Sequence, residues 1–242
     1  MIDTILLDLD GTLLRFPLKS FLDAYLAELE KIFAGMGMNP EVSIKAMMVG
    51  TKAMVANDGS MPNSQRFWEK FAECLELSHE RCQAIEAACD SFYSKEFNIV
   101  QSVLEPSDIP ERIVKALATK GYNVVLATNP LFPACAVETR LSWIGLTPRN
   151  FSFTSHYANS TYCKPNLGYY REVLTKIKKE PAQCLMVGNS LTEDMCAGSL
   201  GLATFLVTDY MENETGADVN AYRHGTLAEL ERSLLSLPDI RQ

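Results

Sequence analysis

The chain has 242 residues, of which 47% are hydrophobic and 21% charged, and these are the proportions of an ordinary globular protein rather than of a disordered chain. The formal net charge is −8 and no run of basic residues interrupts the sequence, which argues against nucleic acid or an anionic membrane surface as the partner. An acidic protein that handles an anionic substrate must neutralise it locally, so the composition points to a bound divalent cation.

Cysteine usage and the N-terminal residues indicate a compartment. The seven cysteines include no CxxC pair and no Cys/His cluster at zinc spacing, which favours a reducing environment. Cys74, Cys82 and Cys89 recur at helical spacing and are interpreted as core residues. The apolar start is interrupted by Asp3 and lacks a basic region, so it is a poor signal peptide. No stretch approaches a membrane span. We expect a cytoplasmic protein.

The first half of the chain contains one strand signal followed by a long helical segment. Residues 4–9 form a short apolar run that ends at Asp10-Gly11, which predicts a buried strand. From about 16 to 103 apolar residues fall at helical spacing, with further helices expected near 40–55, 64–77 and 79–97. Trp68 and Phe71, also at helical spacing, are interpreted as core. This pattern predicts an all-helical module inserted after the first strand.

Strand and helix signals alternate in the second half. Apolar runs at 122–127, 151–154, 184–187 and 203–207 predict strands, and helices are expected at 110–120, 134–144 and 166–178. The alternation predicts an α/β fold with a doubly wound parallel sheet. We therefore expect a core domain formed by residues 1–15 and 104–242, and a helical domain formed by residues 16–103.

Ligands of an open parallel sheet bind at the carboxyl ends of its strands, so the residues that close each apolar run are candidate site residues. Two carboxylates two residues apart at a strand end can be given different environments and thus different protonation states, so that one acts as nucleophile and the other as acid. Lys164 precedes a predicted helix and can reach the same place. The candidates at the strand ends are Asp8 and Asp10, Thr128 and Asn129, Ser155, Gly188 and Asn189, and Asp209.

These residues fall into four motifs in a fixed order. The segment Asp8-Leu9-Asp10-Gly11-Thr12 after a buried strand resembles the first motif of the haloacid dehalogenase-like (HAD) superfamily. Ala127-Thr128-Asn129 resembles the second motif, Lys164-Pro165 the third, and the segment from Gly188 to Asp194 the acidic fourth. The resemblance spans most of the chain and implies a Rossmann-like core, with the helical insert as the family's cap. Such a cap is expected to close over the site and to favour small substrates.

The resemblance also implies roles. Asp8 is expected to attack phosphorus, and Asp10 to protonate the leaving oxygen and then to activate water. Lys164, Thr128 and the Asn129 backbone amide are expected to hold the phosphoryl group. Asp8, the Asp10 carbonyl, Asn189 and Asp194 are expected to bind Mg²⁺. Thr12 is expected to fix the turn through its hydroxyl, and Gly11 to permit it. Dehalogenases of the family lack the second acid, so Asp10 favours a phosphatase.

The chain departs from the family pattern at Asn189, where Asp is usual. An amide oxygen ligates Mg²⁺ without adding charge, so Asp194, or less favourably Glu193, is expected to carry more of the binding. Two alternatives stay open, namely a sugar-phosphate phosphomutase and a catalytically impaired module that binds a phosphorylated ligand. The expected partner is a small phosphorylated metabolite, with no nucleic acid and no membrane, and the expected state is a monomer or a small homo-oligomer.

Overall fold

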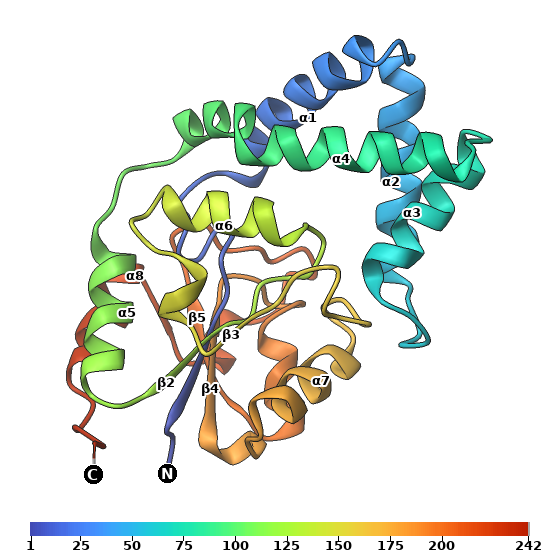
Figure 1. Cartoon of the computed structure of the whole chain (residues 1–242). Helices are drawn as coiled ribbons and strands as arrows, with labels where there is room; N and C mark the ends of the chain where they lie inside the picture. Colours follow the sequence, from blue (N-terminus) through green and yellow to red (C-terminus); the bar gives the residue numbers. More distant parts are fainter. Residues whose placement is uncertain (242) are drawn as a thin grey trace.

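The computed structural model describes residues 1–241, whose centre is a six-stranded parallel sheet (Figure 1). The strand order is β3-β2-β1-β4-β5-β6. Leu7 of β1 lies opposite Leu126 of β2 and Val187 of β4, so β1 is central and its neighbours flank the point where the order reverses. The predicted doubly wound sheet is confirmed. The strands are β1 (Thr4–Leu7), β2 (Asn123–Leu126), β3 (Phe153–Thr154), β4 (Cys184–Gly188), β5 (Ala203–Val207) and β6 (His224–Gly225).

Helices cover both faces of the sheet because successive strand residues point to opposite sides. Ile5 and Leu7 pack on the side of α5 and α8, whereas Leu6 packs with Tyr169 and Val173 of α7. Both faces are buried, which explains why the strands read as continuous apolar runs. The core helices are α5 (Ile109–Thr119), α6 (Ala134–Ser142), α7 (Leu167–Ile177) and α8 (Leu227–Leu235), with short 3₁₀ turns η2 (Pro148–Asn150), η3 (Pro181–Gln183), η4 (Met195–Leu200) and η5 (Val219–Ala221).

Helices α1 to α4 and the 3₁₀ segment η1 lie together over the carboxyl end of the sheet, opposite the two termini (Figure 1). Their starts follow local capping: the Asn39 side chain accepts from the Val42 amide at α2, and Ser78 accepts from the Arg81 amide at α4. We refer to these helices as the cap, and its bounds as a separate domain (16–103) stay a prediction. They are α1 (Leu18–Gly35), α2 (Pro40–Val55), α3 (Asn63–Cys74), α4 (His79–Ser94) and η1 (Glu96–Val103).

Backbone hydrogen bonds tie the cap to the core at two places, and α4 and η1 also pack on α6, where Thr139 Oγ1 donates to the Tyr93 carbonyl at 2.8 Å. At the chain crossings the Glu105 amide donates to the Arg15 carbonyl at 2.8 Å. At the far end, near the start of α3, the Asn63 amide donates to the Ser160 carbonyl at 2.9 Å and the Ser64 amide to the Tyr157 carbonyl at 3.0 Å. These bonds bring the cap against the loop that leads to Lys164.

The structure differs from the sequence-based expectations at several element boundaries. The apolar run at 4–9 overruns β1, because Leu9 is buried in a turn whose carbonyl accepts the Leu13 and Leu14 amides. Neither β6, which has two residues, nor α8 was predicted. The assignment of Cys74 to the core is wrong, since it is exposed, whereas Cys82 and Cys89 are buried. Within residues 1–241 no helix combines the length and the apolar character needed to cross a membrane.

Candidate active site

Asp8 and Lys164 form a buried ion pair at the carboxyl end of the central strand. Asp8 follows β1 directly, and its amide donates to the Val187 carbonyl of β4 at 2.9 Å, which places it at the reversal point. The Lys164 ammonium donates to Asp8 Oδ1 at 2.9 Å and to Asp194 Oδ1 at 2.6 Å. The structure thus brings together three predicted site residues that are separated by as many as 186 positions in the chain.

The charges of this group are fixed by its environment. Burial alone lowers the pKa of Lys164, but the carboxylates of Asp194 and Asp8 more than offset this, so that the pKa lies well above its usual value. Burial raises the pKa of Asp194, and the charge of Lys164 opposes this effect. Lys164 is therefore a permanent cation with 1% of its surface exposed.

Two glycines make room for side chains of the fourth motif. Gly11 has a φ of +74°, and a Cβ there would lie 2.2 Å from Asn189 Nδ2. A Cβ on Gly188 would lie 2.1 Å from the Asp194 carboxyl group. The glycine at position 11 was predicted to permit a tight turn. The structure adds a second reason for it, since the Asn189 side chain packs against the Gly11 backbone.

The hydroxyl of Thr12 links Asp8 to Asn189. It donates to Asp8 Oδ2 at 2.9 Å and lies 3.1 Å from Asn189 Oδ1. Nδ2 of Asn189 donates to the Tyr210 carbonyl at 2.6 Å, which leaves Oδ1 directed at the Thr12 hydroxyl. The Thr12 hydroxyl was predicted to fix the turn, but in the structure its bonds go to the Asp8 and Asn189 side chains, so it orders the site side chains instead.

The residues after β2 are held from two directions. The Thr128 carbonyl accepts from Ser155 Oγ at 2.7 Å and from the Tyr169 hydroxyl at 3.0 Å. The Asn129 side chain donates to Glu193 at 3.0 Å and accepts from the Lys164 amide at 3.2 Å. Burial raises the pKa of Glu193 to about 7. The Asn129 side chain thus ties the second, third and fourth motifs together.

Asp10 has a partner that the sequence did not reveal. Arg140 of α6 is fully buried, and its Nη1 donates to Asp10 Oδ2 at 2.5 Å. Asp10 Oδ1 and Arg140 Nη2 are buried without a hydrogen-bond partner. Burial raises the pKa of Asp10, and the Arg140 charge partly opposes this. An arginine inside a helix carries no sequence signal for such a role.

Two of the strand-end candidates do not join this group. The Ser155 hydroxyl is used in bonds to the backbone of β2. Asp209 pairs with Arg15 at 3.2 Å and accepts from the Leu227 amide at 2.7 Å, so it supports the start of α8. A cavity of about 450 Å³ opens beside Asp10 and Asn189, and Glu212, which the sequence reading did not single out, lines it as well.

Oxygen donors for a cation lie close together at Asp8 and Asn189, although not as a cluster of acids. Within residues 1–241 no three Asp, Glu, His or Cys side chains converge as a metal site. Asp8 Oδ2 and Asn189 Oδ1 both lie against the Thr12 hydroxyl and are hard oxygen donors of the kind that Mg²⁺ prefers. Both Asp194 oxygens are already engaged, by Lys164 and by the Ser190 amide.

A doubly wound sheet with a buried lysine between two carboxylates at its reversal point, covered by a helical cap, defines a class of α/β enzymes that act at the strand ends. A family model for haloacid dehalogenase-like hydrolases matches residues 2–199, and the chain belongs to this family. The resemblance stated from the four motifs is confirmed. No curated protein of related sequence matches the chain.

Solved structures share the fold at low sequence identity. A HAD phosphatase from Thermococcus onnurineus has a TM-score of 0.59 at 18% identity, with 99% of this chain and 100% of that chain covered. An L-2-haloacid dehalogenase from Xanthobacter autotrophicus has a TM-score of 0.57 at 17% identity, with 98% and 100% covered. The HAD-hydrolase YfnB from Bacillus subtilis, bound to magnesium, has a TM-score of 0.56 at 18% identity, with 98% and 99% covered. These similarities show the fold alone.

Proposed function

We propose that this hydrolase is a Mg²⁺-dependent phosphatase that cleaves phosphate monoesters of small molecules through an aspartyl-phosphate on Asp8. The observation that carries the proposal is the buried Lys164 ammonium between Asp8 and Asp194. A fixed cation beside the nucleophile neutralises the dianionic phosphoryl group and stabilises the charge that develops in the transition state. It also keeps the Asp8 carboxylate in place for attack.

In the proposed reaction a carboxylate oxygen of Asp8 forms a bond to phosphorus while the bond from phosphorus to the alcohol oxygen breaks. Asp10 gives its proton to the leaving alcohol and then takes one from the water that hydrolyses the aspartyl-phosphate. The raised pKa of Asp10 suits the first of these tasks. Thr128 and the Asn129 amide are proposed to hold phosphoryl oxygens, because they follow β2 beside Asp8.

The proposed cation site uses Asp8, the Asp10 carbonyl and Asn189. A bound Mg²⁺ supplies positive charge that polarises the phosphoryl oxygens. Asp194 was predicted as a further ligand, but its engaged oxygens favour a supporting role in which it holds Lys164 and the Ser190 amide. Burial raises the pKa of Glu212, with the Asp8 and Asp194 charges adding to the effect. Asn189 lines the same cavity as Glu212, so a cation held by Asn189 would offset that repulsion.

The test is a panel of small phosphate esters, assayed for released phosphate with Mg²⁺ and with EDTA. The proposal predicts release that requires Mg²⁺ and is lost in Asp8→Asn. Halide release from 2-haloacids in place of phosphate release would contradict it. An isomerised sugar phosphate as product identifies the phosphomutase alternative, and tight phosphate-ester binding without turnover identifies the impaired binding module.

The dehalogenase reading is disfavoured by Asp10. The dehalogenases proper of this family lack a second acid, and here that acid is present and paired with a guanidinium. The cap, which contacts the loop before Lys164, is proposed to exclude water and bulky substrates from the site. If phosphoproteins were hydrolysed much faster than compact phosphate esters, this role of the cap would be wrong.

A further inference from the structure

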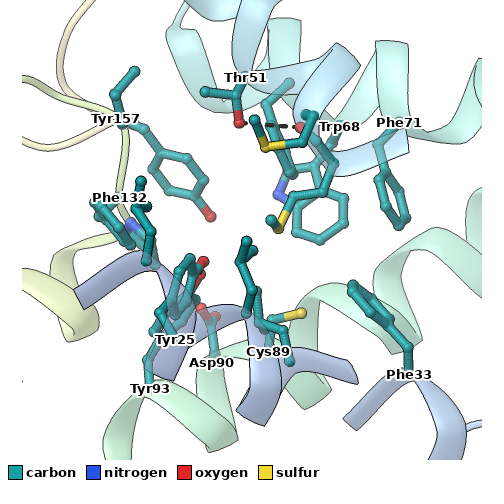
Figure 2. A pocket seen from close by; sticks show the side chains of 18 residues that line it. Tyr25, Phe33, Thr51, Trp68, Phe71, Cys89, Asp90, Tyr93, Phe132 and Tyr157 are labelled. Atoms are coloured by element: carbon teal, nitrogen blue, oxygen red, sulfur yellow. Dashed lines mark hydrogen bonds between the residues drawn. The ribbon is translucent and has the colours of Figure 1, made fainter. Parts of the chain in front are cut away.

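The cleft between the cap and the core contains an apolar cavity of about 200 Å³. All four cap helices contribute to its wall, and two core loops close it (Figure 2). Trp68 and Phe71 of the cap face the core residues Phe132 and Tyr157 across this space, and Tyr25 packs beside Phe132 with ring centroids 5.5 Å apart. At the rim Leu22 and Met48 are 39% and 47% exposed, so apolar side chains also surround the opening.

Part of the core wall of the cavity belongs to the same loop as the proposed phosphate-binding residues. This part includes Leu131 and Phe132, which follow Thr128 and Asn129 in that loop. The Leu131 amide donates to the Asn129 carbonyl at 2.8 Å, so the loop turns tightly and keeps this wall within one short turn of the phosphate-binding residues. The Phe132 ring in turn lies 4.2 Å from the Arg140 guanidinium, which holds Asp10.

The polar groups of the lining are few, and most are already paired. The Tyr25 and Tyr93 hydroxyls bond to each other at 2.5 Å, and the Tyr157 hydroxyl donates to Glu86 at 3.3 Å. Nε1 of Trp68 makes no short hydrogen bond, but it lies beside the Tyr157 hydroxyl, where burial raises the pKa of that phenol and the indole N–H partly opposes this effect. The sequence analysis interpreted Trp68 as a core residue, and in the structure it also lines this cavity (Figure 2).

We propose that this cavity binds the alcohol part of the substrate, and that this part is a compact apolar group, a single aromatic ring or a short alkyl chain. The inference rests on the proposed phosphatase function and specifies its substrate class. A cavity of about 150 Å³ holds one benzene molecule, so about six to eight carbon atoms fill this one.

A sugar does not suit this wall. Each of its hydroxyls loses water on entry and finds an aromatic or aliphatic side chain in place of a partner. The Asp90 carboxylate at the cavity likewise disfavours a second anionic group on the substrate. The proposal therefore also separates this chain from the sugar-phosphate phosphomutase alternative.

The experiment is a series of n-alkyl phosphates from methyl to decyl, assayed with the wild-type protein and Mg²⁺. From propyl onward the alcohols hardly differ in acidity, so changes in kcat/KM report binding of the chain. We expect kcat/KM to rise about fourfold for each added methylene and to level off at about six to eight carbons. A series that is flat, or that falls from methyl onward, overturns the proposal.

Variants of Thr51 place the effect in this cavity. Thr51 lies in its wall on α2, with its hydroxyl bonded to the Met47 carbonyl of its own helix. Thr51→Phe adds a ring to the space and should reduce the ratio of hexyl to methyl phosphate kcat/KM toward one. Thr51→Val keeps the volume and should keep the ratio. If both variants keep the wild-type ratio, the assignment to this cavity is wrong.

Direct binding separates this inference from the proposed function. The affinities of n-hexylphosphonate and methylphosphonate, measured by calorimetry with Mg²⁺, should differ by the same factor per methylene in the wild-type protein. If phosphate is released from all alkyl esters at one rate and the two phosphonates bind equally, the proposed phosphatase function is supported and the proposed apolar site is wrong. If no ester is hydrolysed but hexylphosphonate binds much more tightly than methylphosphonate, the proposed phosphatase function is wrong and the proposed apolar site is supported.

Discussion

Nη1 of Arg140 donates to Oδ2 of Asp10 at 2.5 Å, from a guanidinium that is completely buried and stacked on Phe132. This bond joins a core helix to the second acid of the first motif, across 130 positions of sequence. The guanidinium opposes the effect of burial on the pKa of Asp10, so it adjusts the acid that is proposed to donate and then accept a proton.

Removal of that charge should change the pH dependence of the second half-reaction. In Arg140→Gln the pKa of Asp10 rises further, so the carboxylate that activates water is lost at a higher pH as the solution is acidified. The acidic limb of phosphoenzyme hydrolysis therefore shifts to higher pH. Arg140→Lys keeps the charge and should keep the limb nearer to that of the wild type. Stopped-flow measurement of phosphoenzyme hydrolysis across pH locates the acidic limb in each protein. An acidic limb at the same pH in all three proteins would contradict the role of Arg140.

Lys164→Met should separate the catalytic from the structural role of the lysine. Removal of one partner of a buried pair costs about 3–5 kcal/mol of stability, because two buried carboxylates lose their counter-charge. Activity should fall roughly a hundredfold to a thousandfold. In the double variant Lys164→Met/Asp194→Asn one carboxylate becomes neutral, so stability recovers in part while activity does not. Urea unfolding and kcat measure the two effects, and a parallel recovery of both would show that the lysine is only structural.

Asn189→Asp should tighten the apparent affinity for Mg²⁺, because a carboxylate replaces a neutral amide beside Asp8. Turnover at saturating Mg²⁺ need not rise. Asn189→Ala, which removes the oxygen, should weaken the affinity. A titration of activity against Mg²⁺ in which the Asp variant is unchanged or weaker would remove Asn189 from the coordination sphere.

Gly188→Ala should impair catalysis through position alone. The new Cβ would lie 2.1 Å from the Asp194 carboxyl group, so Asp194 must move and its bond to Lys164 must lengthen or break. We expect a loss of kcat of at least about tenfold. Gly198→Ala is the matched control, because its Cβ meets only Thr204 at 3.6 Å, an ordinary contact. Equal activity in the two variants would show that the position of Asp194 does not matter.

The sequence reading succeeded where the signal is local. Asp8 and Asp10 close a buried apolar run, so their place at the end of β1 followed from the chain itself. The role of Lys164, which precedes α7, came from its resemblance to the third motif. The alternation of strands and helices likewise predicted the parallel sheet, whose two faces are both covered by helices. Features that depend on neighbouring residues could therefore be predicted from the sequence alone.

The rest depends on contacts between distant segments. Neither the pairing of Arg140 with Asp10 nor the contact between Thr12 and Asn189 could be predicted from the spacing of residues in the sequence. Helical periodicity showed that Trp68 is apolar and faces inward, but not that a cavity lies beyond it. The two-residue β6 is too short for any periodicity to develop.

The central claim is that Asp8 is the nucleophile. The most direct measurement is rapid quenching of the Asp10→Asn protein mixed with ³²P-labelled aryl phosphate and Mg²⁺, followed by mass spectrometry of the labelled peptide. An aryl leaving group needs little protonation, whereas hydrolysis of the phosphoenzyme still needs a base, so the intermediate should accumulate with phosphate on Asp8. Asp8→Asn should show no label and no turnover. Label on any other residue, or near-normal turnover by Asp8→Asn, would contradict the mechanism.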